Sequence, residues 1–281
     1  MRQAFIGFDV GGTNIAAGIV SPHGRILKFI SHPAEAKKGK KQIAQNTLLV
    51  LDSLLKSNIS CLGLCLAWPS PANMPLTLEE IKGIINKKYR YPIYFENDAN
   101  LFTLAEALIG QGKKYKTVVG LTLGTGIGCG VVDNKKIFNG RGLASEFGHV
   151  SLNFNGPVCV CGQRGCFEEY AGSRTLRRLA KKYKLSSQTG RELYDLAKGG
   201  NKKALKVWQD FGKNLGLGLN GVIKAYDPDI IVLGGQISRA YQFFKGAMYQ
   251  ELRYRPFFKL PIIKVSKLKN AAIVAAAFMD K

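Results

Sequence analysis

Acidic residues, histidine and tryptophan are scarce in this chain of 281 residues. It contains 19 Asp and Glu against 41 Lys and Arg, and only 3 His and 2 Trp, so its formal net charge is +22. Such an excess favours anionic partners such as nucleotides, nucleic acid or acidic surfaces. The lysines, however, stand in short groups with few aromatic residues between them on which bases could stack. The pattern therefore favours a solvated, charged surface over a nucleic-acid site.

Long apolar runs are also absent. No stretch reaches the roughly 18 apolar residues of a membrane-spanning helix, and the N-terminus, MRQAFIGFDV, begins with strand-like sequence in place of a basic and then apolar signal segment. We therefore expect a soluble, cytoplasmic protein without a membrane partner. A chain of 281 residues with 46% apolar content is long enough for about two domains.

The order of apolar and polar segments predicts an α/β protein. Residues 4–30 contain three apolar runs separated by glycines and by the turn SPHG, which is typical of consecutive antiparallel strands. Residues 117–138 repeat this theme, and such a repeat suggests two related domains with a cleft between them. We place the domains at 1–104 and 105–268, and expect the final helix, 269–281, to pack back onto the first. Other predicted segments are helices at 42–56, 76–88 and 99–109, and strands at 59–67, 91–97, 229–235 and 261–266.

Two Thr/Gly turns could bind phosphate: DVGGTN at residues 9–14 and LTLGTGIG at residues 121–128. Glycines let backbone N–H groups approach an anion, and a threonine hydroxyl adds a donor. Two such turns could bind one polyphosphate from opposite sides, with Mg²⁺ held through water by Asp9. The LGG stretch could lie against adenine or ribose. The candidate ATP- and phosphate-binding residues are Asp9, Gly11, Gly12, Thr13, Asn14, Gly124, Thr125, Gly126, Gly234 and Gly235.

Each turn taken alone could also be an ordinary glycine hairpin. The chain has no Walker A loop, G-x-x-x-x-G-K-[ST], so any phosphate site must be of another kind.

Six motifs, DVGGTN, ENDAN, LGTGIG, EFGH, CVCGQRGCFEE and LGG, occur in the order found in the ROK (repressor, open reading frame, kinase) family of sugar kinases and sugar-sensing repressors. The chain resembles this family over nearly its whole length. The resemblance implies the actin-like, ribonuclease H-like ATPase fold, in which two related domains close over ATP and a sugar. It also implies a homodimer, because dimers are common among the resembling kinases.

The stretch YFENDAN places Asp98 between a strand and a helix, near donors that would keep it ionised and able to accept a hydroxyl proton. Asn97 and Asp98 also suit the N-cap of the helix at 99–109, and the two roles are compatible. In the resembling kinases the matching Asp is the base that activates the sugar hydroxyl, and the residue matching Asn97 binds the sugar.

Six cysteines are present, and three of them lie close together in CVCGQRGC, at Cys159, Cys161 and Cys166. They could form a redox centre, half of a disulfide framework or part of a metal site. A cytosolic chain has little use for a disulfide, and the C-x-C spacing differs from the redox C-x-x-C. The zinc motif of the resembling family matches these cysteines and His149. That His-Cys₃ set would close a tetrahedral, structural Zn²⁺ site without an open position.

The resemblance further assigns sugar contacts around this loop. Glu146 and Glu168 match residues that reach the sugar hydroxyls, and the zinc ligand His149 is a further sugar contact in the same pattern. Carboxylates suit this role because each can accept two hydroxyl hydrogen bonds. The alternative for Glu168 and Glu169 is a solvated helix start.

One segment departs from the family pattern. After the strand at 59–67 the chain reads AWPSPANMPLTLEE, where Ser70 replaces an expected glycine and a longer excursion that supplies a sugar-binding Asn is largely deleted. Asn73 is the residue that could replace it. A shorter loop should open one wall of the sugar site, so a bulkier sugar derivative could fit.

We therefore expect an ATP-dependent, glucokinase-like kinase that phosphorylates a hexose, at C6, with Asp98 as general base. The alternatives are an N-acetylmannosamine or N-acetylglucosamine kinase, a fructokinase, and a non-catalytic sugar-sensing regulator. DNA binding is not expected, because the first strand starts by Ala4 and a family repressor places a winged helix-turn-helix before it. The substrates would be ATP and a hexose or N-acetylhexosamine.

Overall fold

The computed structural model describes residues 2–11, 13–68, 76–187, 189–253 and 259–279. The chain forms two compact units, one comprising Met1–Ile109 and Leu268–Lys281, the other comprising Gly110–Lys267. The boundary expected after residue 104 falls within helix α3 (Asp98–Leu108), all of which belongs to the first unit. In the described part of the chain, no helix combines the length and the apolar content needed to cross a membrane.

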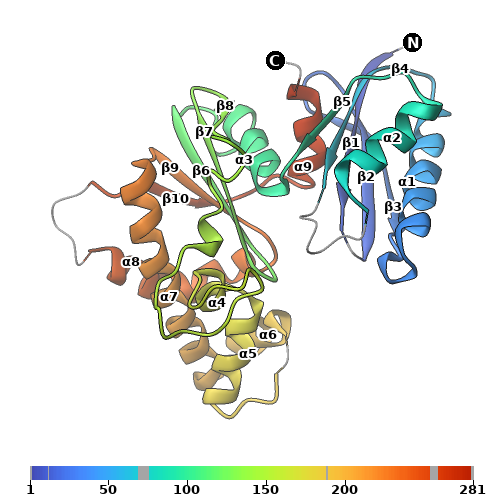
Figure 1. The fold of residues 1–281 in the computed structure, drawn as a ribbon. Coiled ribbons are helices and arrows are strands. Elements are labelled where there is room, and N and C mark those ends of the chain that lie inside the picture. Colours follow the sequence, from blue (N-terminus) through green and yellow to red (C-terminus); the bar gives the residue numbers. More distant parts are fainter. Residues whose placement is uncertain (1, 12, 69–75, 188, 254–258, 280–281) are drawn as a thin grey trace. The chain divides into compact units, whose positions relative to one another are not determined.

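The first unit is built on a mixed sheet (Figure 1). Its strands, in spatial order, are β3 (Ile26–Pro33), β2 (Asn14–Val20), β1 (Arg2–Val10), β4 (Ile59–Ala67) and β5 (Ile93–Glu96). The first three are antiparallel, as the apolar runs predicted, whereas β1, β4 and β5 are parallel. Asp9 pairs with Ala67, which pairs with Glu96, so the carboxyl ends of these three strands meet at one edge.

Helices cover both faces of this sheet (Figure 1). On one face, α1 (Lys40–Leu55) and α2 (Leu78–Lys88) enclose a core that includes Ile6 and Phe8 of β1. On the other face lies α9 (Ala271–Ala275), which continues into a 3-10 helix, η4 (Ala276–Phe278), and packs against β1 and α3. A Cβ on Gly7 would lie 2.2 Å from the carbonyl oxygen of Ile273. Only glycine therefore allows α9 to approach this closely.

The sheet of the second unit has the same connectivity as the first. Its strands, in spatial order, are β10 (Ile262–Val265), β9 (Ile230–Gly234), β6 (Thr117–Leu123), β7 (Ile127–Asp133) and β8 (Lys136–Ile137). The hairpin β6–β7 corresponds to β1–β2, and the parallel neighbour β9 corresponds to β4. The repeated theme predicted from residues 117–138 is thus present in the structure.

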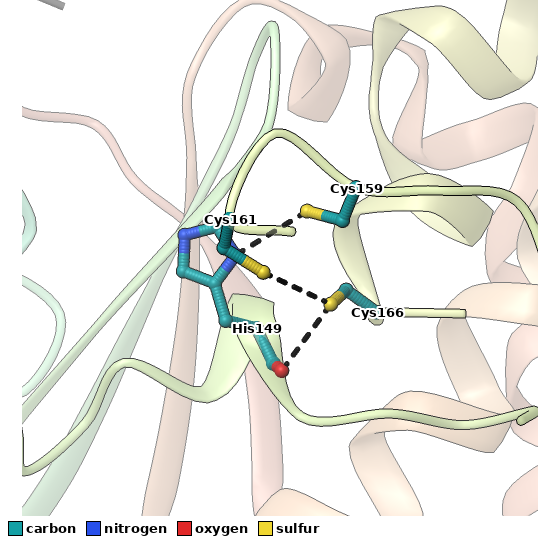
Figure 2. A group of neighbouring side chains, drawn as sticks. All are labelled: His149, Cys159, Cys161 and Cys166. Carbon is teal, nitrogen blue, oxygen red and sulfur yellow. Dashed lines mark hydrogen bonds between the residues drawn. The ribbon is translucent and has the colours of Figure 1, made fainter. Parts of the chain in front are cut away.

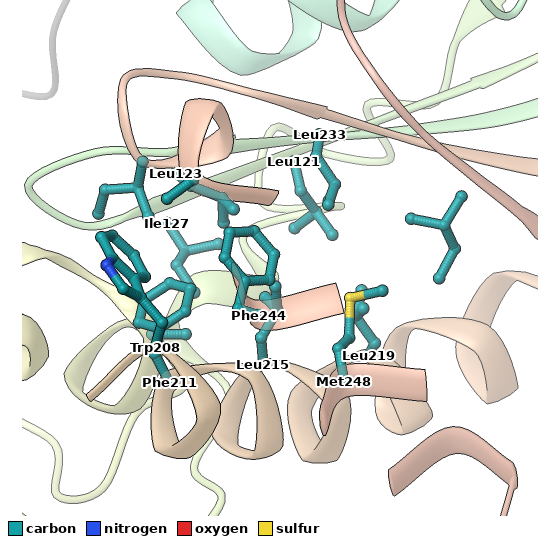
Figure 3. Packing of buried hydrophobic residues seen from close by; sticks show 14 of the residues in the cluster. Leu121, Leu123, Ile127, Trp208, Phe211, Leu215, Leu219, Leu233, Phe244 and Met248 are labelled. Carbon is teal, nitrogen blue, oxygen red and sulfur yellow. The ribbon is translucent and has the colours of Figure 1, made fainter. Parts of the chain in front are cut away.

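Two long helices, α7 (Lys202–Tyr226) and α8 (Tyr241–Arg253), cover the face of this sheet that carries Leu121, Leu123 and Leu233 (Figure 3). An aromatic group of Trp208, Phe211 and Phe244 lies between helices and sheet, with ring centroids of Phe211 and Phe244 5.3 Å apart. Shorter helices pack against α7, namely α4 (Glu168–Ala171), α5 (Ser173–Lys182) and α6 (Gly190–Lys198). The remaining 3-10 helices are η1 (Ala36–Lys38), η2 (Phe147–His149) and η3 (Ile237–Ala240).

Candidate functional site

Two carboxylates lie at the carboxyl edge of the first sheet. Asp9 is near the end of β1, and Asp98 follows β5 as the first residue of α3. Both are accessible to solvent, yet enough protein surrounds them to affect their ionisation. Burial and the negative charge of Asp98 raise the pKa of Asp9 from 3.8 to about 6. A carboxyl group with a pKa in this range can exchange protons near neutral pH.

Asp98 has a more basic carboxylate than the sequence alone suggested. The backbone N–H of Ala99 donates to its Oδ1 at 2.8 Å, which favours the ionised form, as expected. Burial nevertheless dominates and raises the pKa of Asp98 above the ordinary value of 3.8. A raised pKa makes this carboxylate a better proton acceptor.

Asn97, and not Asp98, is the N-cap of α3. Its Oδ1 accepts hydrogen bonds from the N–H groups of Ala99 at 2.8 Å and Asn100 at 3.4 Å. Glu96 fixes the same turn, because its Oε1 accepts from the N–H of Asn97 at 2.8 Å and from Nδ2 of Asn100 at 3.0 Å. This leaves the side chain of Asp98 free of the capping role and presented by a rigid turn.

The Thr/Gly turn of the first unit joins β1 to β2. The N–H of Gly11 donates to the carbonyl of Asn14 at 2.9 Å, which closes the turn. The backbone carbonyl of Thr13 accepts from the N–H of Ala34 at 2.8 Å. Gly12 lies outside the described residues, as do Ser70 and Asn73 in the shortened loop at 69–75.

The Thr/Gly turn of the second unit joins β6 to β7. The N–H of Gly124 donates to the carbonyl of Gly126 at 3.0 Å, and the N–H of Ser173 donates to the carbonyl of Gly124 at 2.9 Å. The start of α5 is thereby bound to the turn. Gly234 ends β9 beside this hairpin. Gly235 follows with a φ of +79° and packs against the backbone of Leu123. A Cβ there would lie 2.3 Å from the Leu123 carbonyl oxygen, so this position requires glycine.

A cavity of about 760 Å³ opens beside the turn of the second unit. Its polar lining includes Thr125, Gln236 and Arg239, and its apolar lining includes Leu176 and Trp208. The full lining is Gly124, Thr125, Ser173, Leu176, Gly190, Arg191, Tyr194, Asp195, Lys198, Trp208, Gln236, Ile237, Arg239 and Ala240. The volume and mixed lining suit a ligand of nucleoside size. Trp208 is 1% exposed and packs in the core, and it also forms part of this wall.

Four side chains converge in the loop between β8 and α4 (Figure 2). The Sγ of Cys159 lies 3.5 Å from Nδ1 of His149, and the Sγ atoms of Cys161 and Cys166 are 3.5 Å apart. The four candidate ligand atoms all lie within 4.8 Å of one another. The other cysteines lie apart from this cluster; Cys65 and Cys129 are buried and Cys61 is half-buried.

The arrangement fits a tetrahedral zinc ion. Zn–S bonds of about 2.3 Å and Zn–N bonds of about 2.0 Å separate neighbouring ligand atoms by about 3.5 to 3.8 Å. The two ligand pairs above match this spacing. Four protein ligands would complete the coordination shell, so an ion bound here would have a structural role and no position for substrate.

The backbone around the cluster is tied to the second sheet. A Cβ on Gly148 would lie 2.1 Å from the carbonyl oxygen of Ile127, which shows how closely η2 packs against β7. The N–H of Phe167 donates to the carbonyl of Val150 at 2.9 Å. Residue Ser145, just before Glu146, is buried with a φ of +72°, an uncommon conformation for a residue with a side chain. Glu146 itself is exposed.

Glu168 and Glu169 do not form a solvated helix start. Their exposed fractions are 6% and 2%, and each contacts an arginine of α5. The Oε1 of Glu168 lies 3.1 Å from the Sγ of Cys159, and a Cβ on Gly126 would lie 2.0 Å from its Oε2. Glu168 thus links the cysteine cluster to the Thr/Gly turn of the second unit.

Comparison with known proteins finds similar proteins over most of the chain. A model described as "ROK family" matches residues 5–280. A glucokinase of Thermotoga maritima is 33% identical over a region that covers 89% of this chain and 87% of the glucokinase. A xylose repressor of Bacillus subtilis is 33% identical over an aligned region that covers 64% of this chain and 47% of the repressor.

A solved structure is similar to this chain over nearly its whole length. A ROK family glucokinase from Streptomyces griseus, in complex with glucose and AMPPNP, is 26% identical with a TM-score of 0.84, and 98% of each chain is covered.

Proposed function

Because the chain belongs to the ROK family, we propose that it transfers the γ-phosphoryl group of ATP to a hexose, with glucose as the leading substrate and the C6 hydroxyl as acceptor. The glucokinase relative and the sugar- and nucleotide-bound structural neighbour support an ATP-dependent sugar kinase. The observation that carries the proposal is Asp98, a solvent-accessible carboxylate with a raised pKa on a rigid turn beside Asp9.

In this proposal, Asp98 accepts the proton of the attacking sugar hydroxyl as its oxygen bonds to the γ-phosphorus. The N–H groups of the two Thr/Gly turns bind the phosphates. Asp9 would hold Mg²⁺ through water, and that ion would neutralise charge on the phosphates. Sugar hydroxyls are assigned to Asn97 and Asp98 in the first unit, and to Glu146, His149 and Glu168 in the second.

The cavity of the second unit is assigned to the adenosine of ATP. Leu176, Trp208 and Ile237 would contact the base, and Gln236 and Arg239 supply polar groups for base or ribose. Among the described candidate nucleotide residues, only Gly124 and Thr125 line this cavity, so the assignment adds the segments 190–198 and 236–240 to the site.

A panel assay tests the function directly. ADP release from ATP·Mg²⁺ would be measured with glucose, mannose, fructose, allose, N-acetylglucosamine and N-acetylmannosamine. Stimulation by glucose above the other sugars supports the proposal, whereas a strong preference for an N-acetylated sugar or fructose selects one of the alternative kinases. A chain that binds a sugar without releasing ADP would be a sugar-sensing regulator, and one relative of the chain is a xylose repressor.

The glycine at 126 should matter for the sugar. In Gly126→Ala, the new Cβ would occupy the space of Oε2 of Glu168 and displace this carboxylate. The KM for the sugar should rise about tenfold, the value of one hydrogen bond to a charged group. Gly83→Ala on α2 is the control, because nothing lies within 4 Å of its Cβ position and Gly83 is outside the proposed site. Equal sugar KM values in the two variants would contradict the prediction.

Activity should also depend on pH in one direction. A general base works only when ionised, and burial raises the pKa of Asp98 above 3.8. The sugar kcat/KM should therefore fall as the pH decreases through that raised pKa, while the enzyme remains folded by circular dichroism. A profile that is flat on the acid side down to the ordinary carboxyl range would be inconsistent with Asp98 as the base.

A further inference from the structure

A guanidinium joins two buried carboxylates beside the cysteine cluster. Nη2 of Arg174 lies 3.0 Å from Oε1 of Glu168 and 2.5 Å from Oε1 of Glu169. The side chain of Glu168 is 8% exposed, that of Glu169 is 3% exposed, and that of Arg174 is 28% exposed. Two like charges this well buried require a countercharge between them. Arg174 supplies it from the neighbouring helix, because the chain turns at Gly172 between α4 and α5.

Arg174 is fixed with respect to the Thr/Gly turn. The preceding residue, Ser173, donates its N–H to Gly124 of that turn, and the missing Cβ of Gly126 leaves the space that Oε2 of Glu168 occupies. One oxygen of Glu168 is thus held by Arg174 while the other lies over the turn. The carboxylate has no room to rotate without losing one of these contacts.

The other donor to Glu168 is Cys159. Within the described residues, the hydrogen bonds that Oε1 of Glu168 accepts come from the Sγ of Cys159 at 3.1 Å and from Nη2 of Arg174; Nδ1 of His149 is 4.0 Å away. A cysteine that binds zinc does so as a thiolate and has no proton to donate. With metal bound, Arg174 is the remaining donor to Oε1 of Glu168 among the described residues, so it alone orients this oxygen.

We propose that Arg174 is a positioning residue for sugar binding, which holds Glu168 in the orientation that accepts the sugar hydroxyls. The inference rests on the sugar contact assigned to Glu168 in the proposed function. Arg174 acts through Glu168 and makes no contact with the reacting atoms. Glu169 and Arg178 form the outer part of the network: Nη1 of Arg178 lies 3.1 Å from Oε2 of Glu169, and Nη2 of Arg178 contacts the Glu169 carbonyl.

The network supplies its own matched control. Arg174 and Arg178 lie one turn apart on α5, and both contact Glu169, but only Arg174 contacts Glu168. Arg174→Met and Arg178→Met therefore remove the same charge from the same helix. Sugar affinity would be measured by titration calorimetry on the zinc-loaded protein, together with sugar and ATP KM, melting temperature and zinc content.

We expect R174M to weaken sugar binding about tenfold to a hundredfold, as loss of a hydrogen bond between charged groups does. The KM for ATP and the zinc content should stay near the parent values. The side chain of Arg178 is 44% exposed in the parent protein, so R178M should weaken sugar binding less than about fivefold. Arg174→Lys should retain most of the affinity, because a single nitrogen bridges the two carboxylates. If R174M does not fold, Arg174→Gln replaces it, with the same expected direction.

A double-mutant cycle shows whether Arg174 acts through Glu168. In a Glu168→Gln background, where the carboxylate is already lost, R174M should cause little further loss of sugar affinity. Equal losses in R174M and R178M, unchanged affinity in R174M, or a full additional loss in the E168Q background would each overturn the inference.

The proposed function can fail separately from this inference. If the parent protein binds a sugar but releases no ADP, the kinase assignment fails, and the calorimetric affinities of the variants still decide the role of Arg174. If the parent binds no sugar of the panel, both are overturned.

Discussion

Asp98→Asn should lower kcat for sugar phosphorylation about 10³-fold, within the range that general-base catalysis contributes. The amide has nearly the same shape as the carboxylate and can still accept from the N–H of Ala99, but it cannot take up a proton. Because Asn97 caps α3, the substitution should leave the helix start intact. Coupled ADP release would measure the loss of kcat, and calorimetry should find the sugar dissociation constant within about threefold of the parent value.

Asp52→Asn is a suitable control for this variant. Asp52 lies on α1, and its carboxylate pairs with Lys88 at 2.7 Å between partly exposed side chains, an interaction of little energetic weight. It should retain full turnover. Undiminished turnover in Asp98→Asn would instead show that another group accepts the proton.

Removing the cysteine cluster should have the second large effect. Metal analysis of the purified protein should find about one zinc per chain, as a closed four-ligand site holds. In Cys166→Ser the metal should be lost, and sugar affinity should fall about 10²-fold or more, because Phe167 and Glu168 directly follow this ligand in the chain. Zinc content by mass spectrometry and sugar affinity by calorimetry measure the two outcomes.

Cys61→Ser provides the comparison for this experiment. Cys61 is half-buried on β4 and lies outside the cluster, so its replacement should keep both zinc and sugar affinity. A Cys166→Ser protein with full zinc content would contradict the ligand assignment. Loss of zinc without loss of sugar affinity would show that the loop keeps its shape without metal.

The strands and helices were predictable because their signals are local. Apolar runs separated by glycines and by the turn SPHG predicted β1, β2 and β3, and the repeat of a Thr/Gly turn predicted the matching hairpin β6–β7. The strand-to-helix turn at Asp98 was equally readable, because cap and strand residues are adjacent in sequence. The cysteine cluster was predictable because three of its four side chains lie within eight residues of sequence, and His149 lies only ten residues before Cys159.

The environment of Glu168 and Glu169 was not predictable in this way. Two acidic residues at a helix start resemble a solvated N-terminus until the next helix folds back and brings Arg174 against them. The cavity walls were missed for the same reason, since Leu176, Tyr194 and Arg239 come from segments far apart in sequence. Their spacing carries no period that a sequence pattern could reveal. The raised pKa of Asp98 likewise depends on surrounding protein, not on its neighbours in sequence.

The close packing of α9 on Gly7 has a consequence for synthesis of the chain. The first unit consists of two separate segments, Met1–Ile109 and Leu268–Lys281, with the second unit inserted between them. On a ribosome, Gly110–Lys267 can complete its core while the first unit still lacks the helix that covers one face of its sheet. The second unit should therefore fold earlier, and the sheet that carries Asp9 and Asp98 should become stable only after α9 emerges.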